Sequence, residues 1–283
     1  HAVVGYGFDA RRMMSGSIKT TRVLAFASGK GGVGKTLLSL NTAVALARQH
    51  HSVVLFDGDM GLANVHVLLG TQPRATVADV LAGRCDLAQT MFVGPEGIKI
   101  IPGGSGIRDL ADLPSGEFAR LLQGLQDVQP PPDYLIIDTG AGIGSHVTTL
   151  VQLADIVVVV VRDEPASLAD AYGLIKVAHT EFQCQSFHIV VNDVKDAQRG
   201  QQVFTRLQDV AMRFLGLPLT LSGVVPHDDS ITDAMRRRES VVTAFPESRA
   251  AAAIRRLAGE LSNAALATDA KRFLLDKLGR GRG

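Results

Sequence analysis

The stretch from Ser28 to Thr36 carries the residue types and spacing of a phosphate-binding loop. It matches the pattern G-x-x-x-x-G-K-[ST] from Gly29 to Thr36. Glycines let backbone N–H groups approach an anion, and a following helix adds unpaired donors and the positive end of its dipole. In such loops the lysine, here Lys35, reaches the β- and γ-phosphates, and the hydroxyl of Thr36 binds Mg²⁺. We therefore predict a site for a nucleotide's phosphates with Mg²⁺, formed by Gly29, Lys30, Gly31, Gly32, Val33, Gly34, Lys35, Thr36 and Leu37.

Acidic residues follow two further apolar runs of the sequence. Asp57 and Asp59 come after the run 53–56, and Asp138 ends the run 134–137, as in a Walker B segment. In open parallel sheets, ligands lie outside the carboxyl ends of the strands. We therefore expect Asp138 to face Mg²⁺ through water. Of Asp57 and Asp59, one can hold a water of the Mg²⁺ shell and the other can orient the attacking water.

Polar residues also end two later runs. Asn192 follows 187–191, and Pro226, His227 and Asp228 follow 219–225. A side-chain amide at a strand end can pair with a purine edge, although alone it is more often a strand cap. We expect His227 to be a loop residue rather than a catalyst, because no Ser or Cys nucleophile pairs with it.

The elements that must position these residues alternate between strand and helix. Short apolar strands are predicted at 23–27, 53–56, 98–101, 134–137, 156–161, 187–191 and 219–225, and helices at 37–47, 117–125, 167–182, 198–215 and 247–264. The run 156–161 has no polar alternation, which is typical of a parallel strand covered on both faces. No hairpin signal is visible. The pattern predicts an α/β fold with a doubly wound, mostly parallel sheet and helices on both faces.

Composition limits the function classes. The 283 residues are 46% hydrophobic and 20% charged, as in ordinary globular proteins, and the net charge of +1 gives no overall attraction to nucleic acid or anionic lipid. Cys85 and Cys184 lie far apart without metal spacing, which favours two reduced thiols in a cytoplasmic protein. Neither an apolar run of ~20 residues nor a secretory signal is visible. We expect one ATPase domain at 21–264, after a poorly ordered extension at 1–20.

A second lysine in the loop, Lys30, has no local need, since one lysine suffices for the cradle. The sequence K-G-G-V-G-K-T resembles the deviant Walker A box of the MinD/ParA group of ATPases. The resemblance implies that Lys30 reaches the nucleotide of a partner subunit. It also assigns Asp59 to the attacking water and Asp57 to the metal side. It further implies that Asn192 and the segment Pro226-His227-Asp228 clasp adenine.

Longer segments resemble the FlhG (FleN) family of flagellar-number regulators. They are 61–70, 76–81, 94–97, 101–106 and 237–246, within a resemblance that runs from Arg22 to Leu261. The resemblance implies a slow, Mg²⁺-dependent ATPase that forms a homodimer with ATP and regulates flagellar number or placement. An FlhF-type GTPase and a FleQ-type transcription regulator are the implied partners.

Two features depart from that family. The stretch 9–14 lacks the Gln and Leu of the N-terminal motif D-Q-A-x-x-L-R, which puts stimulation of the GTPase in doubt. Gly140 stands where the family often has Pro or Ala.

The tail 265–283 is basic and imperfectly amphipathic. It fits either a helix that docks reversibly on the inner face of the cytoplasmic membrane or a terminal helix folded on its own core.

Other functions remain open at this stage. A MinD-like cell-division ATPase and a ParA-like DNA-partition ATPase share the same loops. Near-neutral charge without a basic stripe argues against direct nucleic-acid binding. A nucleotide-bound scaffold without turnover is a third alternative, against which the presence of Lys35, Thr36, Asp59 and Asp138 argues.

Overall fold

The computed structural model describes residues 21–59, 65–104 and 115–265. The predicted N-terminal extension, the motif-like stretch 9–14 and nearly all of the tail 265–283 lie outside the described residues, as do Met60 to Asn64 after Asp59.

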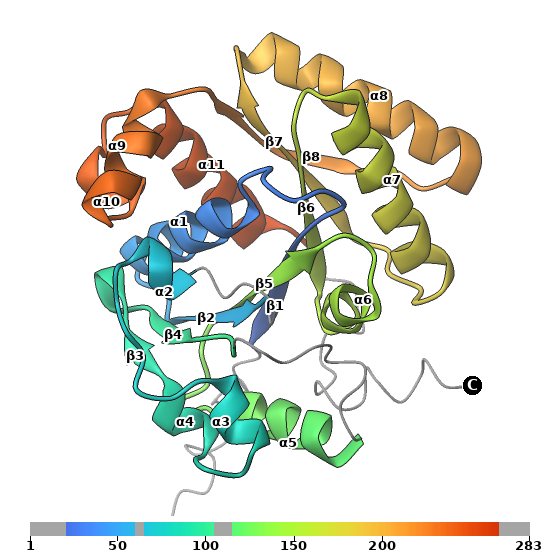
Figure 1. Ribbon diagram of the computed structural model, residues 1–283. Helices are drawn as coiled ribbons and strands as arrows, with labels where there is room; N and C mark the ends of the chain where they lie inside the picture. The colour runs from blue at the N-terminus through green and yellow to red at the C-terminus, as the bar shows by residue number, and fades with distance from the viewer. Residues whose placement is uncertain (1–20, 60–64, 105–114, 266–283) are drawn as a thin grey trace, which may run out of the picture.

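A single twisted sheet organises the described chain, with helices on both faces (Figure 1). Its order is β3-β4-β2-β5-β1-β6-β7-β8. The strands are β1 (Arg22–Ser28), β2 (Val53–Gly58), β3 (Phe92–Val93), β4 (Lys99–Ile101), β5 (Tyr134–Ala141), β6 (Ile156–Val161), β7 (Phe187–Val194) and β8 (Thr220–Pro226). All neighbouring pairs are parallel except β3 with β4. The predicted fold class is confirmed.

The helices divide between the two faces of the sheet. One face packs against α1 (Lys35–Arg48), α2 (Val65–Leu68), α9 (Asp229–Arg237), α10 (Val241–Ala244) and α11 (Arg249–Asn263). The other packs against α3 (Val77–Leu81), α4 (Leu87–Thr90), α5 (Ser115–Gln126), α6 (Ser145–Val151), α7 (Pro165–Thr180) and α8 (Ala197–Leu215). A short 3-10 turn, η2 (Pro95–Gly97), joins β3 to β4. Strand β6 is buried at every residue, with alternate valines in the two cores, which explains its unbroken apolar run.

Three details differ from the sequence prediction. The hairpin β3–β4 was missed, because its first strand has only two residues and its turn has no Asn-Gly or Asp-Gly signal. The short helices α2, α3, α4, α6, α9 and α10 were also missed, because they offer too few residues for a helical period. Strands β2, β5 and β7 continue past Asp57, Asp138 and Asn192. These three residues therefore lie within the carboxyl-terminal parts of their strands rather than after the strands.

A polar clasp fixes α1, the helix that follows the phosphate loop, to α10. The Asn41 side chain is buried and donates to Leu37 O at 2.8 Å, while its Oδ1 accepts from the Ser240 hydroxyl at 2.7 Å and from Val242 N at 3.4 Å. Because Ser240 is also the buried N-cap of α10, the clasp holds two elements that are distant in sequence.

We predict that Asn41→Ala lowers the free energy of unfolding by about 1–3 kcal/mol, since it leaves buried donors without their acceptor. Urea denaturation of the nucleotide-free protein measures this. The matched control is Thr243→Ala, which removes an exposed hydroxyl from α10. It should change the free energy of unfolding by less than about 0.5 kcal/mol. Equal stability of the two variants would contradict the role of the clasp.

Candidate nucleotide-binding site

The predicted phosphate loop lies between β1 and α1, at the carboxyl edge of the sheet. Gly34 caps α1 in the left-handed region, with φ 93°, and a Cβ there would lie 2.3 Å from Asn192 Nδ2. A Cβ on Gly29 would lie 2.2 Å from the backbone of Asp170 in α7. Around Gly32, by contrast, nothing lies within 4 Å of such a Cβ. The loop is therefore clamped at both ends and open in the middle, as a phosphate cradle requires.

Lys35 and Asp138 form a buried ion pair beneath the loop. Lys35 Nζ lies 3.0 Å from Asp138 Oδ1, and the two residues are 7% and 0% exposed. Burial raises the pKa of the Asp138 carboxyl above its ordinary value; the Lys35 ammonium and the Thr36 side chain oppose this shift, and the Asp59 carboxylate adds to it. Within the described chain, Asp138 Oδ2 has no hydrogen-bond partner, so an acceptor remains directed at the site.

Asp57 lies beside Asp138 on the neighbouring strand, since the two are register partners in β2 and β5. Its carboxylate is fully buried and accepts from Val65 N at 3.1 Å and from Asp59 N at 3.3 Å. Asp57 thus organises the start of the loop that carries Asp59. Asp59 is partly buried and near enough for its charge to raise the pKa of Asp138. The three carboxylates predicted from the sequence therefore converge near Lys35.

Asn192 is brought to the phosphate loop rather than held apart from it. Its Nδ2 donates to Val33 O at 2.8 Å, and its Oδ1 is buried without a partner among the described residues. The amide therefore fastens the loop with one end and offers a single acceptor with the other. A purine amino group is the donor that such an acceptor fits.

The segment after β8, which the resemblance assigns to adenine, also makes contacts within the described chain. Asp228 caps α9 by accepting from Ser230 N at 3.0 Å, and it also accepts from Ala250 N of α11 at 3.0 Å. His227 is exposed and pairs with Asp193, whose Oδ1 lies 2.6 Å from His227 Nδ1; this hydrogen bond raises the pKa of His227. Pro226 ends β8. These contacts leave Asp228 engaged by backbone N–H groups rather than open to a base.

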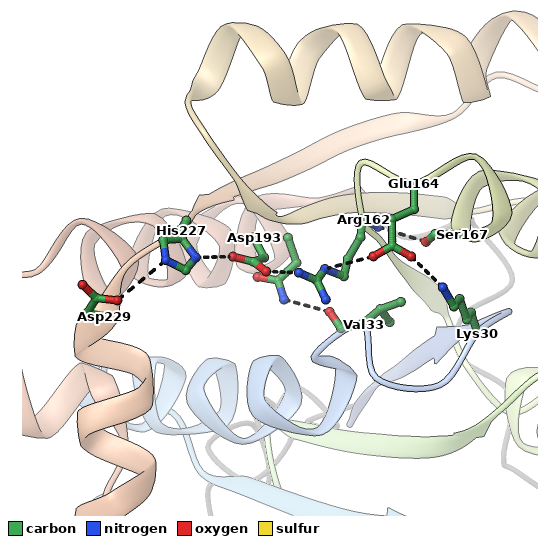
Figure 2. A network of polar contacts seen from close by, with 9 residues as sticks. Lys30, Val33, Arg162, Glu164, Ser167, Asp193, His227 and Asp229 are labelled. Atoms are coloured by element: carbon green, nitrogen blue, oxygen red, sulfur yellow. Dashed lines mark hydrogen bonds and ion pairs between the residues drawn. The ribbon is translucent and has the colours of Figure 1, made fainter.

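A chain of ion pairs crosses the strand ends from the phosphate loop to His227, as Figure 2 shows. Lys30 pairs with Glu164 at 2.6 Å, Glu164 faces Arg162 at 3.9 Å, and Arg162 pairs with Asp193, the partner of His227. Sequence reasoning missed Arg162, Glu164 and Asp193. The signal was present, because these residues follow β6 and end β7, where charged side chains reach the same edge.

The loop after Asp138 lies against the phosphate loop. Gly142 N donates to Ser28 O at 2.8 Å, and the Thr139 hydroxyl donates to Phe26 O at 3.0 Å. A Cβ on Gly140 would lie 2.8 Å from Nε2 of His146. A larger residue at position 140 would require the His146 ring to shift.

Comparison with known proteins identifies the family. Residues 24–241 match the model of the CobQ/CobB/MinD/ParA nucleotide binding domain. The chain belongs to this family. It is 41% identical over 248 residues to the antiactivator FleN of Pseudomonas aeruginosa, covering 88% of this chain and 89% of FleN. It is 30% identical over 242 residues to the flagellum site-determining protein YlxH of Helicobacter pylori, covering 85% of this chain and 82% of YlxH.

A solved structure gives the same result for this MinD/ParA-type ATPase. The septum site-determining protein MinD of Pyrococcus horikoshii, complexed with Mg-ADP, has a TM-score of 0.70 and 25% identity over 86% of this chain and 96% of that one. The predicted resemblance to MinD/ParA ATPases and to the FlhG (FleN) regulators is confirmed.

The residues present fit a magnesium nucleotide. The open glycines leave room for phosphate, buried Lys35 supplies a cation, and Asp138 Oδ2 and Asn192 Oδ1 are acceptors awaiting donors. Mg²⁺ commonly binds through one or two carboxylates, waters and the substrate's phosphates. The residues that would hold Mg²⁺ are Thr36, Asp57 and Asp138.

We predict that Lys35→Ala destabilises the nucleotide-free protein by about 3–5 kcal/mol at pH 8, because the buried Asp138 carboxylate loses its cation. The loss should be smaller at pH 5. Burial raises the pKa of Asp138, so the folded variant takes up a proton that the unfolded chain does not, and its stability falls as pH rises.

Thermal and urea denaturation at the two pH values measure this effect. Adding Asp138→Asn to Lys35→Ala should restore most of the stability, while Lys195→Ala, on an exposed residue, is the control for loss of a lysine. A Lys35→Ala variant as stable as the wild type at pH 8 would disprove the pairing.

Proposed function

We propose that this chain is a nucleotide-controlled switch that closes into a homodimer on ATP and reopens after hydrolysis. One observation carries the proposal: the loop has two lysines, and the structure uses them differently. Lys35 lies buried against Asp138, beneath its own cradle, whereas the Lys30 side chain is 41% exposed and directed away from the loop to Glu164. A surplus exposed cation beside a phosphate site is suited to serve a second site.

The chemistry follows from the named residues. Lys35 and the N–H groups of residues 29–36 bind the phosphates, and Asn192 Oδ1 accepts from the adenine amino group. Asp59 orients the attacking water, and Lys30 of the partner subunit stabilises charge on the transferring phosphoryl group. Mg²⁺, when bound, neutralises the β- and γ-phosphate oxygens. Loss of the γ-phosphate removes the charge that Lys30 binds, so the subunits separate.

The similarity to FleN and YlxH supports a role in flagellar number or placement. We propose that the ATP-bound dimer presents a face to an FlhF-type GTPase and a FleQ-type transcription regulator. We also propose a cytoplasmic protein whose basic tail docks reversibly on anionic lipid at the inner face of the cytoplasmic membrane. Within the part of the chain that the structure describes, no helix is long and apolar enough to span a bilayer.

We predict that Asp59→Ala slows ATP hydrolysis by about 10²- to 10⁴-fold and yields a long-lived ATP dimer, because the attacking water loses its orienting base. Lys30→Ala should bind ATP but stay monomeric. Phosphate release and size-exclusion chromatography with light scattering, in ATP and in ADP, measure both. Asp233→Ala, on a half-exposed residue of α9 that pairs with Arg236, is the control. Normal ATP hydrolysis by Asp59→Ala would refute the proposal. So would a wild-type protein whose mass in solution is the same in ATP and in ADP.

A further inference from the structure

Glu164 lies where it can compete for Lys30. Lys30 Nζ lies 2.6 Å from Glu164 Oε2, and the two side chains are 41% and 40% exposed. This hydrogen bond, followed by the Lys30 charge, holds the pKa of Glu164 below its ordinary value. Figure 2 shows Lys30 at one end of the charge network, reaching up to Glu164 from the phosphate loop.

The position of Glu164 is fixed by its surroundings and not by a capping role. It is the N-cap residue of α7, yet its side chain makes no capping hydrogen bond, and Pro165 begins the helix directly after it. The neighbouring turn is tied instead by Arg162 N, which donates to the Ser167 hydroxyl at 3.0 Å. Because Gly29 packs against the backbone of Asp170, α7 and the phosphate loop are held at a set separation. The Glu164 carboxylate is thus presented to Lys30 by two rigid elements.

An ammonium held by its own subunit's carboxylate must leave it to reach a phosphate of another subunit. We propose that Glu164 is a positioning residue that retains Lys30 within its own subunit, so that a triphosphate in the partner's site draws it across the interface and a diphosphate does not. The inference rests on the proposed function, since it assumes that Lys30 acts in trans. A carboxylate carries one negative charge, and the γ-phosphate that ADP lacks adds about one to the competing site, together with oxygens that can accept from the ammonium.

Release of Lys30 does not leave Glu164 without a neighbouring cation. Arg162 Nε lies 3.9 Å from Glu164 Oε1, on the side away from Lys30. Because the carboxylate keeps this neighbour and is partly solvated, breaking the Lys30 pair costs little. The pair therefore opposes closure by a small amount that the γ-phosphate can exceed, and it can re-form after each turnover.

The test removes the charge of Glu164 and keeps its shape. Glu164→Gln should raise the dimer association constant by about two- to thirty-fold, because two exposed ion pairs no longer oppose each dimer. Since each dimer binds two nucleotides, the concentration of a slowly hydrolysed ATP analogue needed for half-maximal dimer should fall by about 1.4- to 5-fold. With ADP, which lacks the group that draws Lys30 across, the substitution should raise the dimer association constant by no more than the same factor. Light scattering across a titration with Mg²⁺ present measures both, and Glu164→Asp should fall between the two proteins.

The residue before Glu164 offers a matched control. Asp163 pairs with Arg199 of α8 and not with Lys30, so Asp163→Asn removes one exposed ion pair from the same turn. It should leave the titration unchanged. The decisive comparison is made in a Lys30→Ala background, where Glu164→Gln should leave the protein monomeric in ATP, as Lys30→Ala alone is, and should leave the affinity of a fluorescent ATP analogue for the monomer the same.

The outcomes separate the two proposals. If the wild type dimerises with ATP but Glu164→Gln dimerises at the same or a higher concentration, the retention of Lys30 is wrong and the switch stands. If Glu164→Gln produces dimer in the Lys30→Ala background, Glu164 acts through another contact and the inference is again wrong. A wild type that stays monomeric at every ATP concentration overturns the switch, and the role of Glu164 with it.

Discussion

The buried pair of Lys35 and Asp138 is the constraint on which the site depends. Each charge would be costly alone in the interior, and each comes from a different strand–loop unit, β1–α1 and β5. Their contact therefore fixes the phosphate loop against the acidic strand end before any ligand arrives. The registers of β1, β5 and β2 then place Phe26, Asp138 and Asp57 side by side, so the remaining acids follow from the pairing of the strands.

Much of this arrangement was accessible from the sequence. Apolar runs ending in Asp, with a glycine-rich loop before a helix, predict a parallel sheet and place Asp57, Asp59 and Asp138 at one edge. Those predictions work because parallel strands share a carboxyl edge whatever their order. The strand order itself, and the antiparallel β3, depend on pairings between distant segments that no local pattern records.

The side-chain partners were less accessible, for a physical reason. A carboxylate at a strand end can face a metal, cap a helix or pair with an arginine, and only the packed neighbours decide. The Asp228 carboxylate accepts from backbone N–H groups of α9 and α11, and the Asn192 amide donates to Val33 O. Glu164 follows β6 just as Asp57 follows the core of β2, yet its role depends on the distance set by Gly29 and Asp170.

Both lysines of the loop obey one rule with different strengths. Each is paired with a carboxylate of its own chain. In the proposed switch, the phosphates of a nucleotide compete with that carboxylate for each lysine. The Lys35 pair is buried, so salt screens it weakly. The Lys30 pair is partly exposed, so added salt weakens it; the Debye length is about 10 Å at 0.1 M salt. Binding of nucleotide within a subunit and closure between subunits thus become separable steps, because the first exchanges a rigid buried contact and the second a loose exposed one.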